Sequence, residues 1–146
     1  MDPLVSLLNK ALSNTFVMYF KAHSHHWNVE GIHFSQYHDF FGDLYAELHD
    51  ASDAIAEQIR MLQAKAPVSL TSLYASNGID ENTIAINVSE MINTLLDANS
   101  IVKQSLYDCL KEAQNQNKQG LVNFLADRIM KHDKHDWMLR SSGKGV

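Results

Sequence analysis

FSQYHDFFGDLYAELHDASDAIAEQIRMLQA, residues 34–64, is the stretch that decides the fold. Its apolar residues return every three or four positions, which is the spacing of one face of an α-helix. Pro67 ends the pattern shortly afterwards. At about 1.5 Å per residue, this helix would be roughly 45 Å long. Such a length is unusual for an isolated globular helix and is typical of a helical bundle.

Three further segments show the same helical periodicity, at about residues 3–27, 88–115 and 119–141. The first begins with Asp2 as N-cap and Pro3 at the first helical position. Asn87 and Glu90 have the spacing of a capping box at the start of the next helix. Together with residues 34–64, these segments predict four long helices.

Residues 67–86, between the second and third helices, favour a loop with one short helix around 70–75. A connection of this length is what a bundle with one crossover needs, and an up-and-down bundle with a decorated loop is the alternative. We therefore predict an all-α four-helix bundle with a short helix in that connection. Residues 1–146 fit one domain.

Composition excludes several classes of protein. Apolar residues make up 45% of the 146 residues and charged residues 20%, which is enough for a packed core. The one cysteine, Cys109, rules out an intrachain disulfide framework and a cysteine-based zinc cluster. The net charge of −5 argues against a general nucleic-acid binder. No secretory signal or membrane-spanning apolar run is present, so we expect a cytoplasmic protein that does not enter the membrane.

The segment between Lys21 and Arg60 has an unusual composition. It contains no lysine or arginine, so its seven acidic residues alone carry a charge of −7, against −5 for the whole chain. These acids and the six histidines of the segment are Glu30, Asp39, Asp43, Glu47, Asp50, Asp53 and Glu57, with His23, His25, His26, His33, His38 and His49. Mixed nitrogen and oxygen ligands without thiolates suit Fe(II), Mn(II) or Zn(II). A solvated helix face with capping histidines is the alternative interpretation.

The spacing within residues 34–64 favours the metal site. At about 100° per residue, five positions fall within one arc of about 100°: His38, Gly42, His49, Asp53 and Glu57. His38 and Glu57 are nevertheless about 28 Å apart along the helix, so they cannot bind one ion within one chain. Two such helices packed antiparallel, with a two-fold axis between positions 47 and 48, would bring them together. An isologous dimer would then contain two sites.

Four motifs of this chain resemble those of the Dps miniferritins, and the resemblance covers nearly the whole sequence. They are HWNVEG at 26–31 with a histidine at 38, DAIAEQIR at 53–60, APVSL at 66–70 and DKHDWM at 133–138. The resemblance implies a ferritin-like bundle assembled as a hollow shell of twelve subunits. It also implies oxidation of Fe(II), preferentially by hydrogen peroxide or else by O2, storage of ferric mineral, and protection against oxidative damage.

The resemblance further implies a ferroxidase site with His26 and His38 from one subunit and Asp53 and Glu57 from its mate. One ligand departs from the family pattern, because the family usually has an aspartate where this chain has Gly42. Close helix packing or neutral change is one interpretation of this glycine. A rebuilt site is the other, with His49 as a substitute or additional metal ligand and with altered activity or zinc at the same site.

Other functions remain open at this stage. The first is a DNA-compacting structural protein, although the few basic residues near the chain ends predict weak or absent DNA binding. The second is a shell that does not catalyse oxidation. We expect His132 and His135 at the surface or an interface and Cys109 in the core. Trp27 and Tyr45 either pack the bundle or accept stray oxidising equivalents.

Overall fold

The computed structural model describes all 146 residues and contains five helices and no strand. The helices are α1 (Pro3–Asn28), α2 (Phe34–Met61), α3 (Leu70–Tyr74), α4 (Val88–Asn115) and α5 (Gln119–Ser142). The predicted all-α bundle with a short fifth helix is therefore confirmed. None of these helices combines the length and the apolar character that a membrane span requires.

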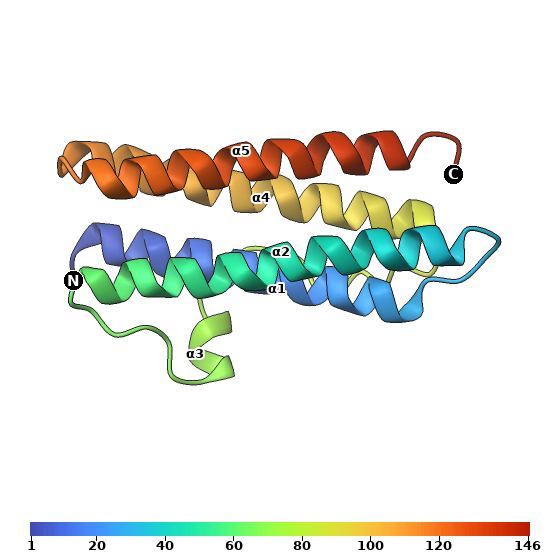
Figure 1. Cartoon of the computed structure of the whole chain (residues 1–146). Helices are drawn as coiled ribbons and strands as arrows, with labels where there is room; N and C mark the ends of the chain where they lie inside the picture. The colour runs from blue at the N-terminus through green and yellow to red at the C-terminus, as the bar shows by residue number, and fades with distance from the viewer.

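The four long helices form two antiparallel pairs, α1 with α2 and α4 with α5 (Figure 1). The chain colours show that α2 and α4 run in the same direction, so the connection between them returns along the length of the bundle (Figure 1). The predicted crossover is therefore correct and the up-and-down alternative is wrong. The short helix α3 lies outside the bundle against α1.

Helix ends follow from local hydrogen bonds. The side chain of Asp2 accepts a 2.9 Å bond from the Leu4 amide and caps α1, as predicted. At α4, the Asn87 side chain accepts from the Glu90 amide, but the Glu90 carboxylate accepts from Ile86 rather than from Asn87. The capping box is thus half formed, with its second bond shifted by one residue.

The second helix is shorter than its apolar pattern indicates. It ends at Met61 rather than near Ala64, because Gln63 takes the left-handed backbone conformation, with φ at 65°. The turn amides of this region bond to carbonyls of the last helical turn, such as the Gln63 amide to the Arg60 carbonyl at 2.9 Å. The face with His38, Asp53 and Glu57 lies entirely within the shortened helix.

A continuous apolar core runs the length of the bundle. It includes residues from every long helix, for example Leu8 of α1, Phe41 of α2, Leu106 of α4 and Leu125 of α5, all without solvent exposure. Cys109 belongs to this core, as predicted, and burial raises the pKa of its thiol to about 12. The core fixes the rotation of each helix, and with it the side chains that face outward.

Candidate metal centre

Two histidines meet where α1 ends and α2 begins. The rings of His26 and His38 are stacked, with centroids 3.7 Å apart and an interplanar angle of 19°. Nδ1 of His26 donates to the His38 carbonyl, and Nδ1 of His38 donates to the His26 carbonyl, each at 2.7 Å. A carbonyl only accepts, so Nδ1 carries the hydrogen in both rings. In each neutral ring Nε2 is therefore left with a free lone pair, as a metal ligand requires.

The same bonds complete the end of α1. The last four carbonyls of a helix lack amide partners within the helix. His38 satisfies the His26 carbonyl, while the Val29 amide bonds to the His25 carbonyl at 3.0 Å. The two histidine rings are thus held in place by hydrogen bonds to the main chain.

Gly42 allows this arrangement. A Cβ atom built at this position would lie 3.1 Å from Nδ1 and 3.2 Å from Cε1 of His26. These distances are shorter than an ordinary van der Waals contact, so a side chain at this position would require the imidazole to shift by a few tenths of an ångström. The structure thus supplies a packing reason for the glycine.

The predicted acidic ligands lie farther along α2. Asp53 and Glu57 are exposed, and neither forms an ion pair or a side-chain hydrogen bond within the chain. His49 is also exposed and lies one turn before Asp53, with its ring centroid 5.0 Å from that of Tyr19. The chain does not bring these residues to His26 and His38. Within one chain, no three histidine, cysteine or acidic side chains come close enough to hold a metal ion.

Aromatic and imidazole rings adjoin the two stacked histidines. The rings of His23 and Tyr45 lie parallel, with centroids 3.9 Å apart, and the edge of Tyr45 faces His26 at 5.2 Å. Burial lowers the pKa of His23, and the nearby His26 and His49 rings lower it further. Trp27 also contacts His23 but is 56% exposed, so packing within its own bundle accounts for only part of its surface.

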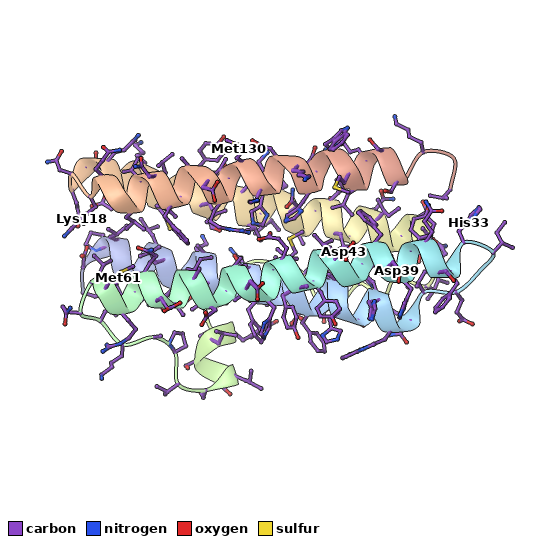
Figure 2. The ribbon with its side chains drawn as sticks, viewed as in Figure 1. His33, Asp39, Asp43, Met61, Lys118 and Met130 are labelled. Carbon is purple, nitrogen blue, oxygen red and sulfur yellow. The ribbon has the colours of Figure 1, made fainter.

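The outer face of α2, with the end of α1 beside it, therefore carries nitrogen and oxygen atoms that can act as metal donors. Figure 2 shows Asp39 and Asp43 on the first half of α2, with His33 in the loop before it. Two imidazole nitrogens are available at one end of the face and two unpaired carboxylates at the other. This donor set fits iron, because neutral nitrogen ligands combine with oxygen ligands that supply negative charge.

A second polar cluster, which the sequence analysis missed, joins α2, α4 and α5. Arg128 donates to both carboxylate oxygens of Glu47, at 2.5 and 3.1 Å, and to Nε2 of His132 at 2.8 Å. Nε2 of His135 donates to Glu47 at 2.6 Å. Nδ1 of His132 donates to the Asn99 side chain, which donates back to the His132 carbonyl. We call Glu47, Asn99, Arg128, His132 and His135 the interior polar network.

This network corrects one expectation. His132 is fully buried and the side chain of His135 is 11% exposed, so neither is a surface residue of the chain. Burial lowers the pKa of His132 well below its usual value, and the charge of Arg128 acts in the same direction. Burial alone would raise the pKa of Glu47, but the hydrogen bonds and charges of His135 and Arg128 hold it well below its usual range.

Comparisons with known proteins agree with this fold. The model of the ferritin-like domain family matches residues 5–142. General stress protein 20U of Bacillus subtilis is 25% identical over 140 residues, which span 96% of this chain and 97% of that protein. DNA protection during starvation protein 2 of Bacillus anthracis is 26% identical over 138 residues, 94% of each chain.

Solved structures are similar over the same length. A Dps protein from Vibrio cholerae is described as a member of a broad superfamily of ferritin-like diiron-carboxylate proteins. It matches with a TM-score of 0.92 at 30% identity, covering 97% of this chain and 89% of that chain. Dps from Staphylococcus aureus matches with a TM-score of 0.90 at 25% identity, covering 98% and 96%.

Proposed function

The chain belongs to the ferritin-like domain family as a Dps miniferritin, and on this premise we propose that it oxidises Fe(II) between subunits and stores the ferric product in a hollow shell. The shell would be a homo-oligomer of twelve subunits built from two-fold dimers. The product would be kept from reacting further with peroxide, which protects against oxidative damage.

The geometry of His26 and His38 carries this proposal. Both rings have Nδ1 fixed on a main-chain carbonyl and Nε2 free, which is how metal-binding histidines are oriented in proteins. A pair of histidines that served only to cap a helix would not need a row of unpaired carboxylates farther along the same face. Asp53 and Glu57 supply that row, and the antiparallel dimer brings the partner subunit's copies to the histidines.

Each ligand has a distinct role in this site. His26 and His38 hold iron without neutralising its charge. Asp53 and Glu57 supply negative charge, which favours the ferric product, and a carboxylate can bridge two irons. Hydrogen peroxide takes one electron from each of two Fe(II) ions and, with two protons, leaves as two water molecules. No hydroxyl radical is released in this stoichiometry.

His49 is the proposed additional ligand. In the antiparallel dimer it lies opposite Ala46 of the partner subunit, and it is one turn from Asp53 on its own helix. It would replace the carboxylate that the family usually has at position 42. Because an imidazole brings no negative charge, oxidation would be slower than with a carboxylate, and zinc would compete for the site.

A complementation experiment tests the shared site. One variant carries His26→Ala and His38→Ala, and a second carries Asp53→Ala and Glu57→Ala. Each variant alone should lack peroxide-dependent Fe(II) oxidation, measured as growth of ferric absorbance. In shells assembled from equal amounts of both, half of the dimers pair unlike chains, and each such dimer has one intact site. About a quarter of the wild-type sites should therefore return.

The result distinguishes the alternatives. If the mixed shells stay inactive while the wild type oxidises iron, ligands are not shared between subunits and the proposed site is wrong. If the wild type binds zinc but produces no ferric absorbance, the protein is a metal-binding shell without ferroxidase activity. His33→Ala, in the loop before α2, is the control that should leave oxidation unchanged. We also propose that DNA binding is weak or absent, which a gel shift at low salt measures.

A further inference from the structure

Asn77 and Gly78 form the sequence pair in which an asparagine deamidates most readily. They lie in the connection between α3 and α4, and Asn77 is the only asparagine of the chain that a glycine follows. In this reaction the main-chain nitrogen of the following residue attacks the side-chain amide carbon, and glycine has no Cβ to hinder the approach. The sequence therefore places a reactive amide in the crossover of the bundle.

The fold does not require a glycine at position 78. Its φ lies outside the left-handed region, in contrast to Gly31 and Gly145. A Cβ atom built on Gly78 would meet the side chains of Asn14 and Ile101 at 3.8 Å each, which is ordinary van der Waals contact. Alanine would fit, and its methyl group would slow the attack. Packing and backbone geometry therefore do not explain the reactive pair.

In the folded chain, hydrogen bonds hold both reacting groups. The Gly78 amide donates to Oδ1 of Asn14 in α1 at 2.8 Å. The Asn77 side chain accepts from the Ile79 amide at 3.0 Å and donates to the Ile79 carbonyl at 2.8 Å. Attack requires the Gly78 nitrogen to lose its proton and to move onto Cγ of Asn77. The bond to Asn14 opposes both changes.

Asn14 forms no other side-chain hydrogen bond. The residue is fully buried, and its Nδ2 has no partner within the chain. An unsatisfied buried donor costs stability, and an apolar residue of the same shape would avoid that cost. The bond to the Gly78 amide is therefore what an asparagine provides at this position.

We propose that Asn77 is a site of spontaneous deamidation and that Asn14 suppresses the reaction while the crossover is closed against α1. Water is the co-reactant. The Gly78 nitrogen gives its proton to solvent hydroxide and forms a bond to Cγ of Asn77, the Cγ–Nδ2 bond breaks, and the amide nitrogen takes up a proton and leaves as ammonia. Water then opens the succinimide ring at one of its two carbonyls, which leaves aspartate or isoaspartate. No electron is transferred.

The product changes how the crossover is anchored. A carboxylate at position 77 has no amide hydrogen to donate, so its charge faces the Ile79 carbonyl oxygen that Nδ2 of Asn77 binds in the unmodified chain. Ile79 is 6% exposed and belongs to the apolar core, so it anchors the crossover to the bundle. Deamidation loosens this anchor, and a chain whose crossover has opened is marked permanently by a charge.

Peptide mass spectrometry of the full-length protein at mildly alkaline pH tests the role of Asn14, because each converted amide adds about 1 Da. Asn14→Leu keeps the side-chain volume but removes the bond, so Asn77 should convert about fivefold faster than in the wild type. Ser13→Ala is the matched control, because Ser13 is also buried on α1 but its hydroxyl has no partner. Equal rates in Asn14→Leu and Ser13→Ala overturn the proposal.

The same measurement in urea separates the fold from the sequence. Unfolded wild type and unfolded Asn14→Leu should convert Asn77 at the same rate, and both should be faster than the folded wild type. Gly78→Ala in urea should be slower than either. A folded wild type that converts as fast as the unfolded chain overturns the protection, even if Asn14→Leu fails to fold. Equal rates of Gly78→Ala and wild type in urea overturn the site itself.

Limited proteolysis tests the effect of the product. Asn77→Asp, which carries the product's charge, should be cleaved within residues 75–87 faster than the wild type. Ser76→Asp adds the same charge at the neighbouring exposed position and should be cleaved like the wild type. Equal cleavage of Asn77→Asp and Ser76→Asp contradicts the loosening of the crossover.

Discussion

At the scale of single residues, Gly42 acts on the site through a contact that its missing side chain would make. A glycine inside a helix costs about 1 kcal/mol relative to alanine. In return, the His26 ring lies close to the α2 backbone and reaches the His38 carbonyl. Helix stability and ligand placement therefore have opposite requirements at this position.

Gly42→Ala tests this opposition. Helix propensity gains about 1 kcal/mol, and displacement of His26 weakens a hydrogen bond of similar worth, so the free energy of unfolding should change by less than about 1 kcal/mol. Fe(II) binding, measured by titration calorimetry, should nevertheless weaken. Gly120→Ala in α5, where a new Cβ meets nothing within 4 Å, is the control that should leave binding unchanged. Equal affinity in Gly42→Ala and the wild type would show that the contact does not position His26.

His25 gives a prediction for pH. The residue is buried, its Nε2 donates to the Thr94 hydroxyl at 3.1 Å, and burial lowers its pKa from 6.5 to about 4. The unfolded chain therefore binds the proton more readily than the folded one between these values. Stability from this residue should be intact above about pH 6.5 and fall by about 3 kcal/mol as the pH drops toward 4.

Denaturant unfolding at several pH values checks this expectation. His25→Gln removes the titrating group and should flatten the decline, leaving the part due to other buried histidines such as His132. His33→Gln, in the exposed loop before α2, should keep the wild-type slope. A His25→Gln curve parallel to the wild type would contradict the assignment.

At the scale of elements, the interior polar network connects α2 to α5, because Glu47 of α2 bonds to Arg128 and His135 of α5. Arg128 and Glu47 have side chains that are 7% and 29% exposed, so their pair is partly desolvated. A buried charge that loses its partner is strongly destabilising, whereas removal of both partners costs less. We therefore expect the pair to contribute to how α2 and α5 are oriented toward each other.

A double-mutant cycle measures this effect. Arg128→Met should destabilise the bundle by about 3 kcal/mol, because Glu47 keeps its charge with only His135 as partner. The combination of Arg128→Met with Glu47→Leu should cost less than the two single changes together. Asp133→Asn, which breaks the more exposed pair with Lys103, should cost less than about 1 kcal/mol. Additive effects of the Arg128 and Glu47 changes would mean that the two are not coupled.

The four long helices could be predicted because apolar periodicity and capping residues both mark them. The early end of α2 could not, since the left-handed conformation of Gln63 leaves no mark in an apolar pattern. The burial of Arg128 and His132 could have been predicted, because both share a helix face with Leu125 and Leu139. Polar residues on an apolar helix face indicate a buried polar network.

The candidate site stays a prediction as a metal centre. Spacing alone places His38, His49, Asp53 and Glu57 on one face of α2, whereas His26 enters only through the family resemblance. The reciprocal bonds between His26 and His38 do not follow from spacing, because they depend on how closely the end of α1 approaches α2. That approach is set by Gly42, a position which sequence reasoning interprets as a missing ligand or as packing with equal ease. The pairing of Asp53 and Glu57 with a second subunit stays a prediction.

At the scale of the whole molecule, one chain leaves apolar surface uncovered beside the proposed dimer face. Leu70 is 74% exposed, and Phe20 and Tyr74 are each 48% exposed. Phe20, Leu70 and Tyr74 line a cavity of about 580 Å³ between α1 and α3. Exposed apolar groups around a cavity are typical of a protein interface, which agrees with assembly into a shell.

Leu70→Asp tests that assembly. Twelve chains of 16.5 kDa give a shell of about 200 kDa, which light scattering should detect for the wild type. A carboxylate at an exposed position should leave the helical content of the chain unchanged but shift the mass toward smaller species. Gln114→Asp, on exposed α4 surface, is the control with a mass like the wild type. An intact shell in Leu70→Asp would place the interface elsewhere.

Because each proposed ligand of the α1–α2 corner is anchored on the main chain of the other, the corner needs no ion to hold its shape. In the proposed function, iron binds at this corner only transiently: it arrives as a soluble ion and is then stored as a mineral. A metal site that keeps its shape after releasing an ion can bind the next ion without refolding. If the proposed site is correct, these imidazole-to-carbonyl hydrogen bonds make the stability of the fold independent of whether iron is bound.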